Sequence, residues 1–98
     1  MPFTCTVPAV PTVLTENERA RITRWDFVPG ATTGWHEHAL DYVVVMMTDA
    51  VMAYEMGGVV TRTELKAGDS YIRPAGIQHD VKNEGALPMA FIEVEMKR

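Results

Sequence analysis

Three histidines are the residues of this sequence best suited to chemistry. His36 and His38 stand two residues apart at the start of an apolar run, and His79 lies in the second half of the chain. Side chains at positions i and i+2 of a β-strand point to the same face, so the pair could present both imidazoles to one ion. His79 follows a Pro-Ala-Gly turn, from which a strand re-entering the sheet could bring it opposite the pair. Imidazole suits Fe, Zn, Ni, Cu or Mn, and the pattern therefore predicts a metal site.

Short β-strands are the elements that must position these side chains. Strands are expected at 21–27, 41–47, 51–56, 59–65, 70–73 and 88–97. The run 41–47 is β-branched and nearly continuous, which is typical of a strand buried on both faces. The last segment alternates Ile92, Val94 and Met96 with Glu93 and Glu95. Short strands with Gly and Pro turns at close spacing predict an all-β sandwich or barrel, and residues 1–98 are expected to form a single domain.

The N-terminal part of the chain is less regular. Prolines at 2, 8 and 11 interrupt the apolar segment 1–13, which is expected to be an extended arm. Such an arm either packs along its own domain or contacts a neighbouring subunit. The segment 15–22 is the only candidate for a helix, and it is short.

Composition excludes several classes of protein. The chain has 98 residues, a net charge of −4 and nine scattered Lys and Arg residues, which argues against a nucleic-acid partner. Cys5 is its only cysteine, so an intrachain disulfide is impossible and a reduced, cytoplasmic location is expected. The longest apolar run is far shorter than the ~20 residues that a membrane span needs. A chain this small is expected to gain stability by forming a homodimer.

The stretch 68–83 resembles the second sequence motif of the cupins. Gly68, Pro74, Gly76, His79 and Asn83 match every defining position of that motif at its spacing. The resemblance covers residues from about 21 to about 95. It implies a jelly-roll barrel, also called a double-stranded β-helix, which is usually dimeric and holds a metal near its open end.

The first cupin motif is matched in part, by Gly30, His36 and His38. The segment 34–45, GWHEHALDYVVV, is similar to the small bacterial cupins of the β-alanine degradation (BauB) type. Together the two motifs imply that His36, His38 and His79 are the metal ligands.

The departure from the first motif concerns the fourth ligand. In common cupins three or four residues separate the second histidine from a Glu, which would fall on Tyr42 or Val43 of this chain. Asp41 is the nearest acid. It could bind or support the metal if it points inward, or it could cap a turn in solvent. A three-histidine site resembles those of the thiol dioxygenases and β-diketone-cleaving dioxygenases in the cupin superfamily. It leaves positions open for substrate and oxygen and favours an anionic, chelating ligand.

Two further residues are candidates for a catalytic role. Tyr42 falls at the position of the missing Glu, and its phenol could orient a substrate. Arg73 precedes Pro74 of the second motif; it could hold a substrate carboxylate by a bidentate contact or pair with an acid at a subunit interface. Trp35 lies between Gly34 and His36, and strand alternation turns it away from the metal face.

The sequence therefore supports two hypotheses. The first is a mononuclear enzyme that acts on a small organic acid, with Fe as the expected metal, Zn, Ni or Mn as alternatives, and a dioxygenase as the favoured reaction. The second is a module without catalysis that binds a small ligand through its metal, as a sensor does. The missing Glu and the lack of an obvious general base motivate the second hypothesis.

Overall fold

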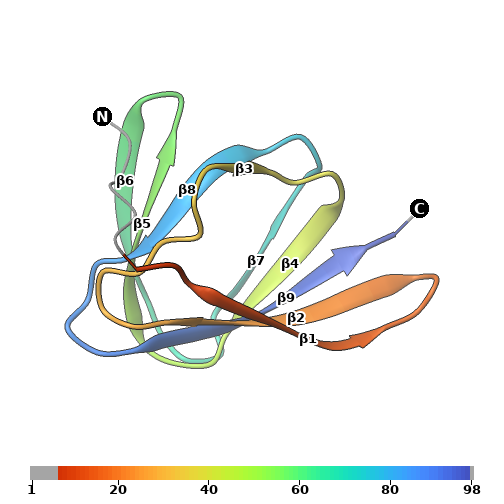
Figure 1. Ribbon diagram of the computed structural model, residues 1–98, viewed down its shortest axis with the longest axis horizontal. Helices are drawn as coiled ribbons and strands as arrows, with labels where there is room; N and C mark the ends of the chain where they lie inside the picture. Colours follow the sequence, from red (N-terminus) through yellow and green to blue (C-terminus); the bar gives the residue numbers. More distant parts are fainter. Residues whose placement is uncertain (1–6, 98) are drawn as a thin grey trace.

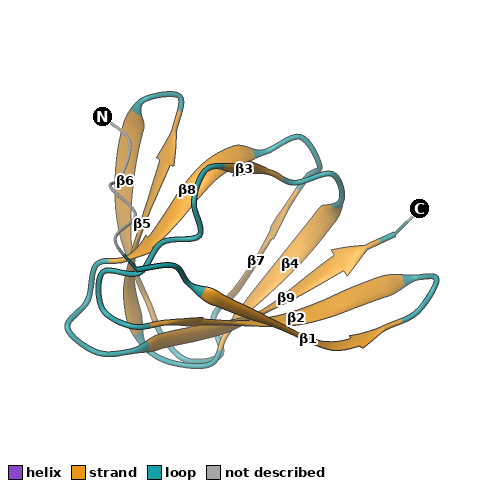
Figure 2. Ribbon diagram, in the orientation of Figure 1, coloured by secondary structure: helices purple, strands orange, loops and turns teal. Residues whose placement is uncertain are grey.

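The computed structural model describes residues 7–97, which form nine β-strands (Figures 1 and 2). The strands are β1 (Val10–Glu16), β2 (Ala20–Phe27), β3 (His36–Glu37), β4 (Asp41–Met46), β5 (Ala50–Met56), β6 (Val59–Leu65), β7 (Ser70–Arg73), β8 (Gln78–Asn83) and β9 (Met89–Met96). No helix occurs in this part of the chain, and so none that could span a membrane. The predicted all-β class is confirmed.

The strands make two antiparallel sheets that face each other. One sheet has the order β1-β2-β9-β4-β7, and the other has the order β3-β8-β5-β6. Figure 1 shows that the sheets lie close together on the left and diverge on the right, near the end of β9. The space between them is therefore open at one end, and β3 and β4 border that end.

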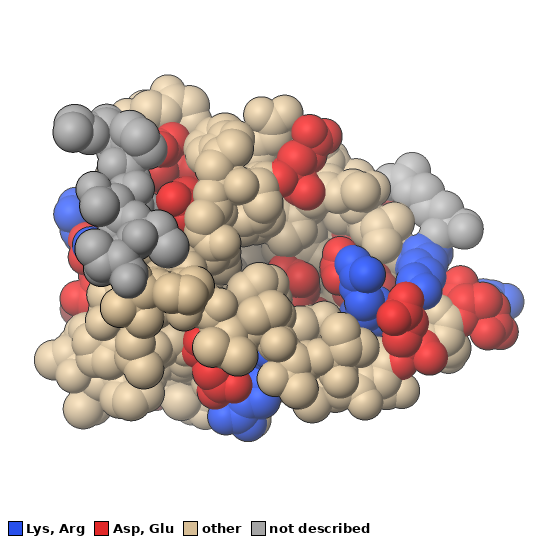
Figure 3. Space-filling model, viewed as in Figure 1, with Lys and Arg blue, Asp and Glu red and all other residues tan. Residues whose placement is uncertain are grey.

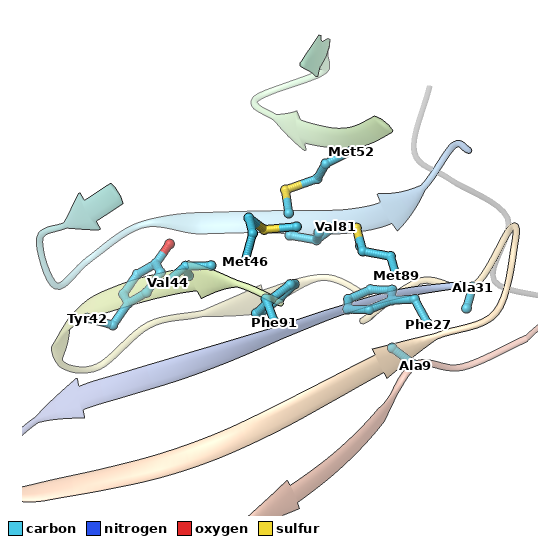
Figure 4. Close-up of a cluster of buried hydrophobic side chains, with 10 residues drawn as sticks. All are labelled: Ala9, Phe27, Ala31, Tyr42, Val44, Met46, Met52, Val81, Met89 and Phe91. Carbon is cyan, nitrogen blue, oxygen red and sulfur yellow. The ribbon is translucent and has the colours of Figure 1, made fainter. Parts of the chain in front are cut away.

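The hydrophobic core fills the closed part of this space. Figure 4 shows Phe27, Phe91, Met46 and Met89 together between the sheets. Tyr42 stands at the other end of the cluster, and its hydroxyl oxygen rises from β4 toward the opposite sheet. The core thus gives way to polar groups toward the open end.

Strand β4 is buried on one face only, so the prediction of burial on both faces is wrong. Tyr42, Val44 and Met46 are buried against the core, whereas Val45 on the other face is 36% exposed. Two-residue alternation places Asp41, Val43 and Val45 on this outer face, which no second layer of the described chain covers. Apolar β-branched side chains thus line both faces of β4, although the fold buries only one.

The predicted helix at 15–22 is also wrong, because this segment forms the turn between β1 and β2. The Asn17 side-chain oxygen accepts hydrogen bonds from the backbone N–H groups of Arg19 at 2.7 Å and Ala20 at 3.0 Å. The Asn17 N–H donates to the Ala20 carbonyl at 2.9 Å. An Asn side chain that bonds its own backbone in this way stabilises a turn and competes with a helix.

The described part of the N-terminal arm packs along its own chain. Ala9 is buried, and its N–H donates to the Thr32 carbonyl at 2.8 Å, while the Thr32 N–H donates to the Val7 carbonyl at 3.0 Å. Strand β1 then continues to Glu16, three residues beyond the predicted arm. Residues 1–6 of the arm lie outside the described part of the chain.

Candidate metal centre

Two short elements of one sheet bring the three histidines together. His36 in β3 pairs directly with His79 in β8. His38 follows β3, and its N–H donates to the Ile77 carbonyl at 2.8 Å while its carbonyl accepts from the Gly76 N–H at 2.8 Å. These bonds tie His38 to the turn that precedes His79. Gly76 has φ +97°, a backbone conformation that favours glycine at this turn.

The side chains converge through their Nε2 atoms. The Nε2 atom of His38 lies 2.9 Å from that of His36 and 3.0 Å from that of His79. Ligating atoms of all three residues lie within 4.8 Å of one another. Two nitrogens bound to one ion at about 2.1 Å and at right angles stand about 3.0 Å apart. The observed spacing therefore fits a shared divalent cation.

The protonation of the rings also fits a cation. The Nδ1 atom of His36 lies 2.8 Å from the Gly34 carbonyl oxygen, which can only accept, so Nδ1 donates a hydrogen bond to it and Nε2 is the nitrogen that faces the other two rings. Burial, with His36 as a further cause, lowers the pKa of His38 to about 4 and that of His79 to about 3. Both rings are thus neutral at pH 7, as a metal ligand must be.

Tyr42 packs directly on this cluster. Its ring stacks on His38, with 3.9 Å between ring centroids, and 2% of the residue is exposed. The Tyr42 hydroxyl is buried and has no hydrogen-bond partner in the described part of the chain. Burial raises the pKa of this phenol. A buried donor without a partner is costly, so this hydroxyl is available to a bound ligand.

Asp41 and Trp35 point elsewhere. The Asp41 carboxylate accepts a hydrogen bond from the Ala75 N–H at 2.8 Å, which places it at the turn before β8. This contact favours the turn-capping alternative, and the carboxylate is part-buried there rather than in open solvent. Trp35 is 53% exposed, in agreement with its predicted orientation.

Arg73 borders a cavity beside the histidines. The cavity has a volume of about 310 Å³. His79, Tyr42, Tyr71 and Arg73 line its polar side, and Met52 and Leu65 are among its apolar walls. The guanidinium lies 4.7 Å from the centre of the Tyr71 ring, and no carboxylate within residues 7–97 forms an ion pair with it. Arg73 is thus free to bind an anion in this cavity.

No sequence motif indicated that Glu93 and Glu95 lie near the histidines. Both point inward from β9 and are at least 91% buried, whereas Ile92 and Val94 point outward. One oxygen of each carboxylate and one nitrogen of His38 lie within 4.8 Å of one another. Burial, with Glu95 as a second cause, raises the pKa of Glu93 to about 7. The alternation in β9 was the available signal, but it does not say which set of residues faces inward.

Glu95 is neutralised at the open end. Arg21 Nε donates to its Oε1 at 2.7 Å, and Lys97 pairs with Glu16 nearby on β1. Figure 3 shows this face of the molecule hollowed between the two sheets, with basic and acidic side chains gathered toward the right-hand end. These charged residues are not among those that line the cavity of about 310 Å³.

Comparison with known proteins agrees with this architecture. Residues 23–95 match the family model described as "Cupin domain". The chain is 44% identical to the β-alanine degradation protein BauB of Pseudomonas aeruginosa over 91% of this chain and 94% of that protein. A crystal structure of a cupin domain from Bordetella pertussis has a TM-score of 0.89 and 43% identity, with 93% of this chain and 95% of that chain covered. A cupin superfamily protein from Desulfitobacterium hafniense has a TM-score of 0.74 at 13% identity, covering 100% and 84%, and shares the fold.

Proposed function

Because this chain belongs to the cupin family, with its double-stranded β-helix fold, we propose that it is a metal-dependent enzyme acting on a small organic acid. Dioxygenase chemistry on Fe(II) is the proposed reaction. One observation carries the proposal: three imidazoles converge through their Nε2 atoms at 2.9 and 3.0 Å, and His79 among them lines a cavity of about 310 Å³. This volume is at the lower end of the range for small-molecule sites.

The three histidines would hold the ion, and when bound it would supply a Lewis acid with open positions for substrate and oxygen. Arg73 would bind the substrate's carboxylate, because its guanidinium has no acidic partner in the described chain. Tyr42 would orient the substrate through a hydroxyl that has no other partner among residues 7–97. The apolar walls of the cavity would hold the rest of a small molecule and keep water out.

The relative from Pseudomonas aeruginosa supports the substrate class. Its name places it in the degradation of β-alanine, a small carboxylic acid, and it covers 91% of this chain. A fold that is reused as widely as this one does not fix a reaction, so the proposal rests on the site rather than on the fold.

The test is the metal content and oxygen consumption of protein purified without an affinity tag or chelator. We expect near-stoichiometric iron, lost in a His36→Ala/His79→Ala variant and kept in Gln78→Ala. Gln78 is a matched control because it neighbours His79 but is exposed and bonds to Glu37 at 3.3 Å. Iron-loaded protein should consume oxygen with one or more members of a panel of β-diketones, thiols and keto acids.

Other outcomes would contradict the proposal in different ways. Metal binding without turnover of any panel member would favour the sensor hypothesis, which Tyr42 at the position of the motif's Glu also favours. Zinc or nickel in place of iron would favour a hydrolytic, isomerising or non-catalytic role over the dioxygenase reaction. Absence of metal even after reconstitution would overturn the metal site itself.

A further inference from the structure

Glu93 is the residue of the interior that the proposed function leaves unexplained. It lies on β9 between Val44 on one side and Thr23 on the other, and it is 8% exposed. Val44 and Thr23 are themselves buried. A carboxylate in such surroundings loses much of its hydration, which is costly unless a positive charge or donors compensate. Donors such as the Trp25 indole act on Glu93, and a nearby cation would compensate its burial further.

A second, much smaller cavity lies beside this carboxylate. Its volume is about 10 Å³, which is the scale of a single water molecule or small ion. Its walls include His36, His38, His79, Tyr42, Thr33 and Glu93. The three imidazoles and the β9 carboxylate thus border the same small space.

The distances define how Glu93 relates to the histidines. One Glu93 oxygen lies within 4.8 Å of a ring nitrogen of His38, whereas the group of ligating atoms that includes His36 and His79 does not include Glu93. Glu93 therefore approaches the site from the side of His38. This is the side on which β9 runs beside β4.

We infer that Glu93 is the carboxylate of this metal centre, supplied by β9 instead of by the position after the second histidine. The inference rests on the proposed metal site. A divalent ion held by three neutral imidazoles keeps its full charge, and the nearby carboxylate halves that charge. Tyr42 stands at the sequence position of the motif's Glu. Glu93, on the neighbouring strand β9, would supply the negative charge that this position lacks.

The test measures metal affinity directly, with Co²⁺ as the probe in competition with a chelator on metal-free protein. We expect Glu93→Gln to lower the affinity about 10- to 100-fold, the usual effect of losing a group that supports a metal ligand. The absorption bands of bound Co²⁺ should shift in the same variant. Glu93→Asp keeps the charge and should keep more of the affinity than Glu93→Gln.

Glu55→Gln is the matched control. It removes the charge of another buried carboxylate, 4% exposed, which lies on β5 outside the groups of ligating atoms and accepts a hydrogen bond from the Gly58 N–H at 3.2 Å. Its Co²⁺ affinity and spectrum should therefore be nearly unchanged. Circular dichroism of each metal-free variant establishes that the protein is folded before metal is added.

The outcomes separate this inference from the proposed function. If wild-type protein binds no Co²⁺, the metal site and the role of Glu93 both fail. If wild-type protein binds Co²⁺ and His36→Ala abolishes binding, but Glu93→Gln binds as tightly as wild type, only the role of Glu93 is overturned. Equal losses in Glu93→Gln, Glu93→Asp and Glu55→Gln would also overturn it, because they would indicate a general effect of altering a buried carboxylate.

Discussion

The two faces of the sheet β1-β2-β9-β4-β7 reverse the usual distribution of side chains. On the inner face, one row of paired residues runs Arg73, Tyr42, Glu95 and Arg21, and the next runs Tyr71, Val44, Glu93 and Thr23. On the outer face, the corresponding row is Ile72, Val43, Val94 and Ile22. Near the open end, the inside of this sheet is thus more polar than its outside.

The difference indicates that the two faces serve different purposes. Buried charges weaken a core unless they are paired or bind a ligand, so the inner rows are explained by a binding site and not by stability. A row of β-branched side chains facing water gains nothing from hydrophobic burial in the monomer. A second layer provided by a partner would explain the outer face.

We expect that partner to be a second copy of this chain, in the homodimer that the sequence predicts. The only ion pair on the outer face, among the residues described, is Arg24 with Asp26, and it is neutral. Asp41 is a further acid on this face, held at the turn before β8 by the Ala75 N–H at 2.8 Å, and the row Ile72, Val43, Val94 and Ile22 carries no charge. Five strands about 4.8 Å apart and about seven residues long span roughly 24 by 23 Å, which is close to the scale of a standard interface of about 800 Å² per partner.

The largest expected effect comes from a charge on the outer face. Val43→Lys should raise the dimer dissociation constant at least about 100-fold, because each copy would bring a charge into an apolar interface. Val59→Lys, on the exposed hairpin of the other sheet, is the matched control and should leave the constant unchanged. Sedimentation equilibrium measures both. A monomeric wild-type protein, or dissociation caused only by removal of residues 1–6, would exclude this interface.

The next effect concerns the pH dependence of metal-free protein, where Glu93 and the histidines act with opposite sign. The pKa of Glu93 is raised from 4.5 to about 7, so the folded state binds more protons in that window and stability falls as pH rises through it. The pKa values of His38 and His79 are lowered from 6.5 to about 4 and about 3, so stability falls as pH decreases below 6.5.

Glu93→Gln should remove only the loss of stability that occurs as pH rises from 4.5 to about 7. The stability of this variant minus that of wild type should therefore be about 2 kcal/mol higher at pH 8 than at pH 5. Urea denaturation with a chelator present, at equal protein concentrations, measures this difference. The same difference at both pH values would mean that Glu93 does not titrate differently in the folded state.

The smallest effect distinguishes the Tyr42 hydroxyl from its ring. Tyr42→Phe should leave the metal-free protein as stable as wild type or more stable by up to about 1 kcal/mol, because it removes a buried hydroxyl without a partner. A loss above about 2 kcal/mol in Tyr42→Phe, by urea denaturation, would show that the hydroxyl has a partner within the chain.

On the outer face, Ile72→Thr should change the stability of the monomer by about 0.5 kcal/mol or less, measured in the same way.

Sequence patterns predicted most strands because alternation and turn residues act locally. The Gly57-Gly58 hairpin is confirmed, and both glycines have positive φ. The segment 15–22 misled the prediction because Glu and Arg favour a helix, whereas the Asn17 side chain stabilises a turn. The three histidines were found together because two motifs of fixed spacing contain all of them.

The sequence by itself determined six of the nine described strands, the cupin fold and the candidate ligands His36, His38 and His79, because each depends on residues close together in the chain or on a motif. Only the tertiary structure decided that Glu93 faces the histidines, that Asp41 caps a turn and that the row from Ile22 to Ile72 lies on the outer face, half-buried except for Ile72, which is exposed. A strand pattern with period two has two equivalent faces, and the direction of each depends on the layer that packs against it. That layer is formed by strands far away in the sequence.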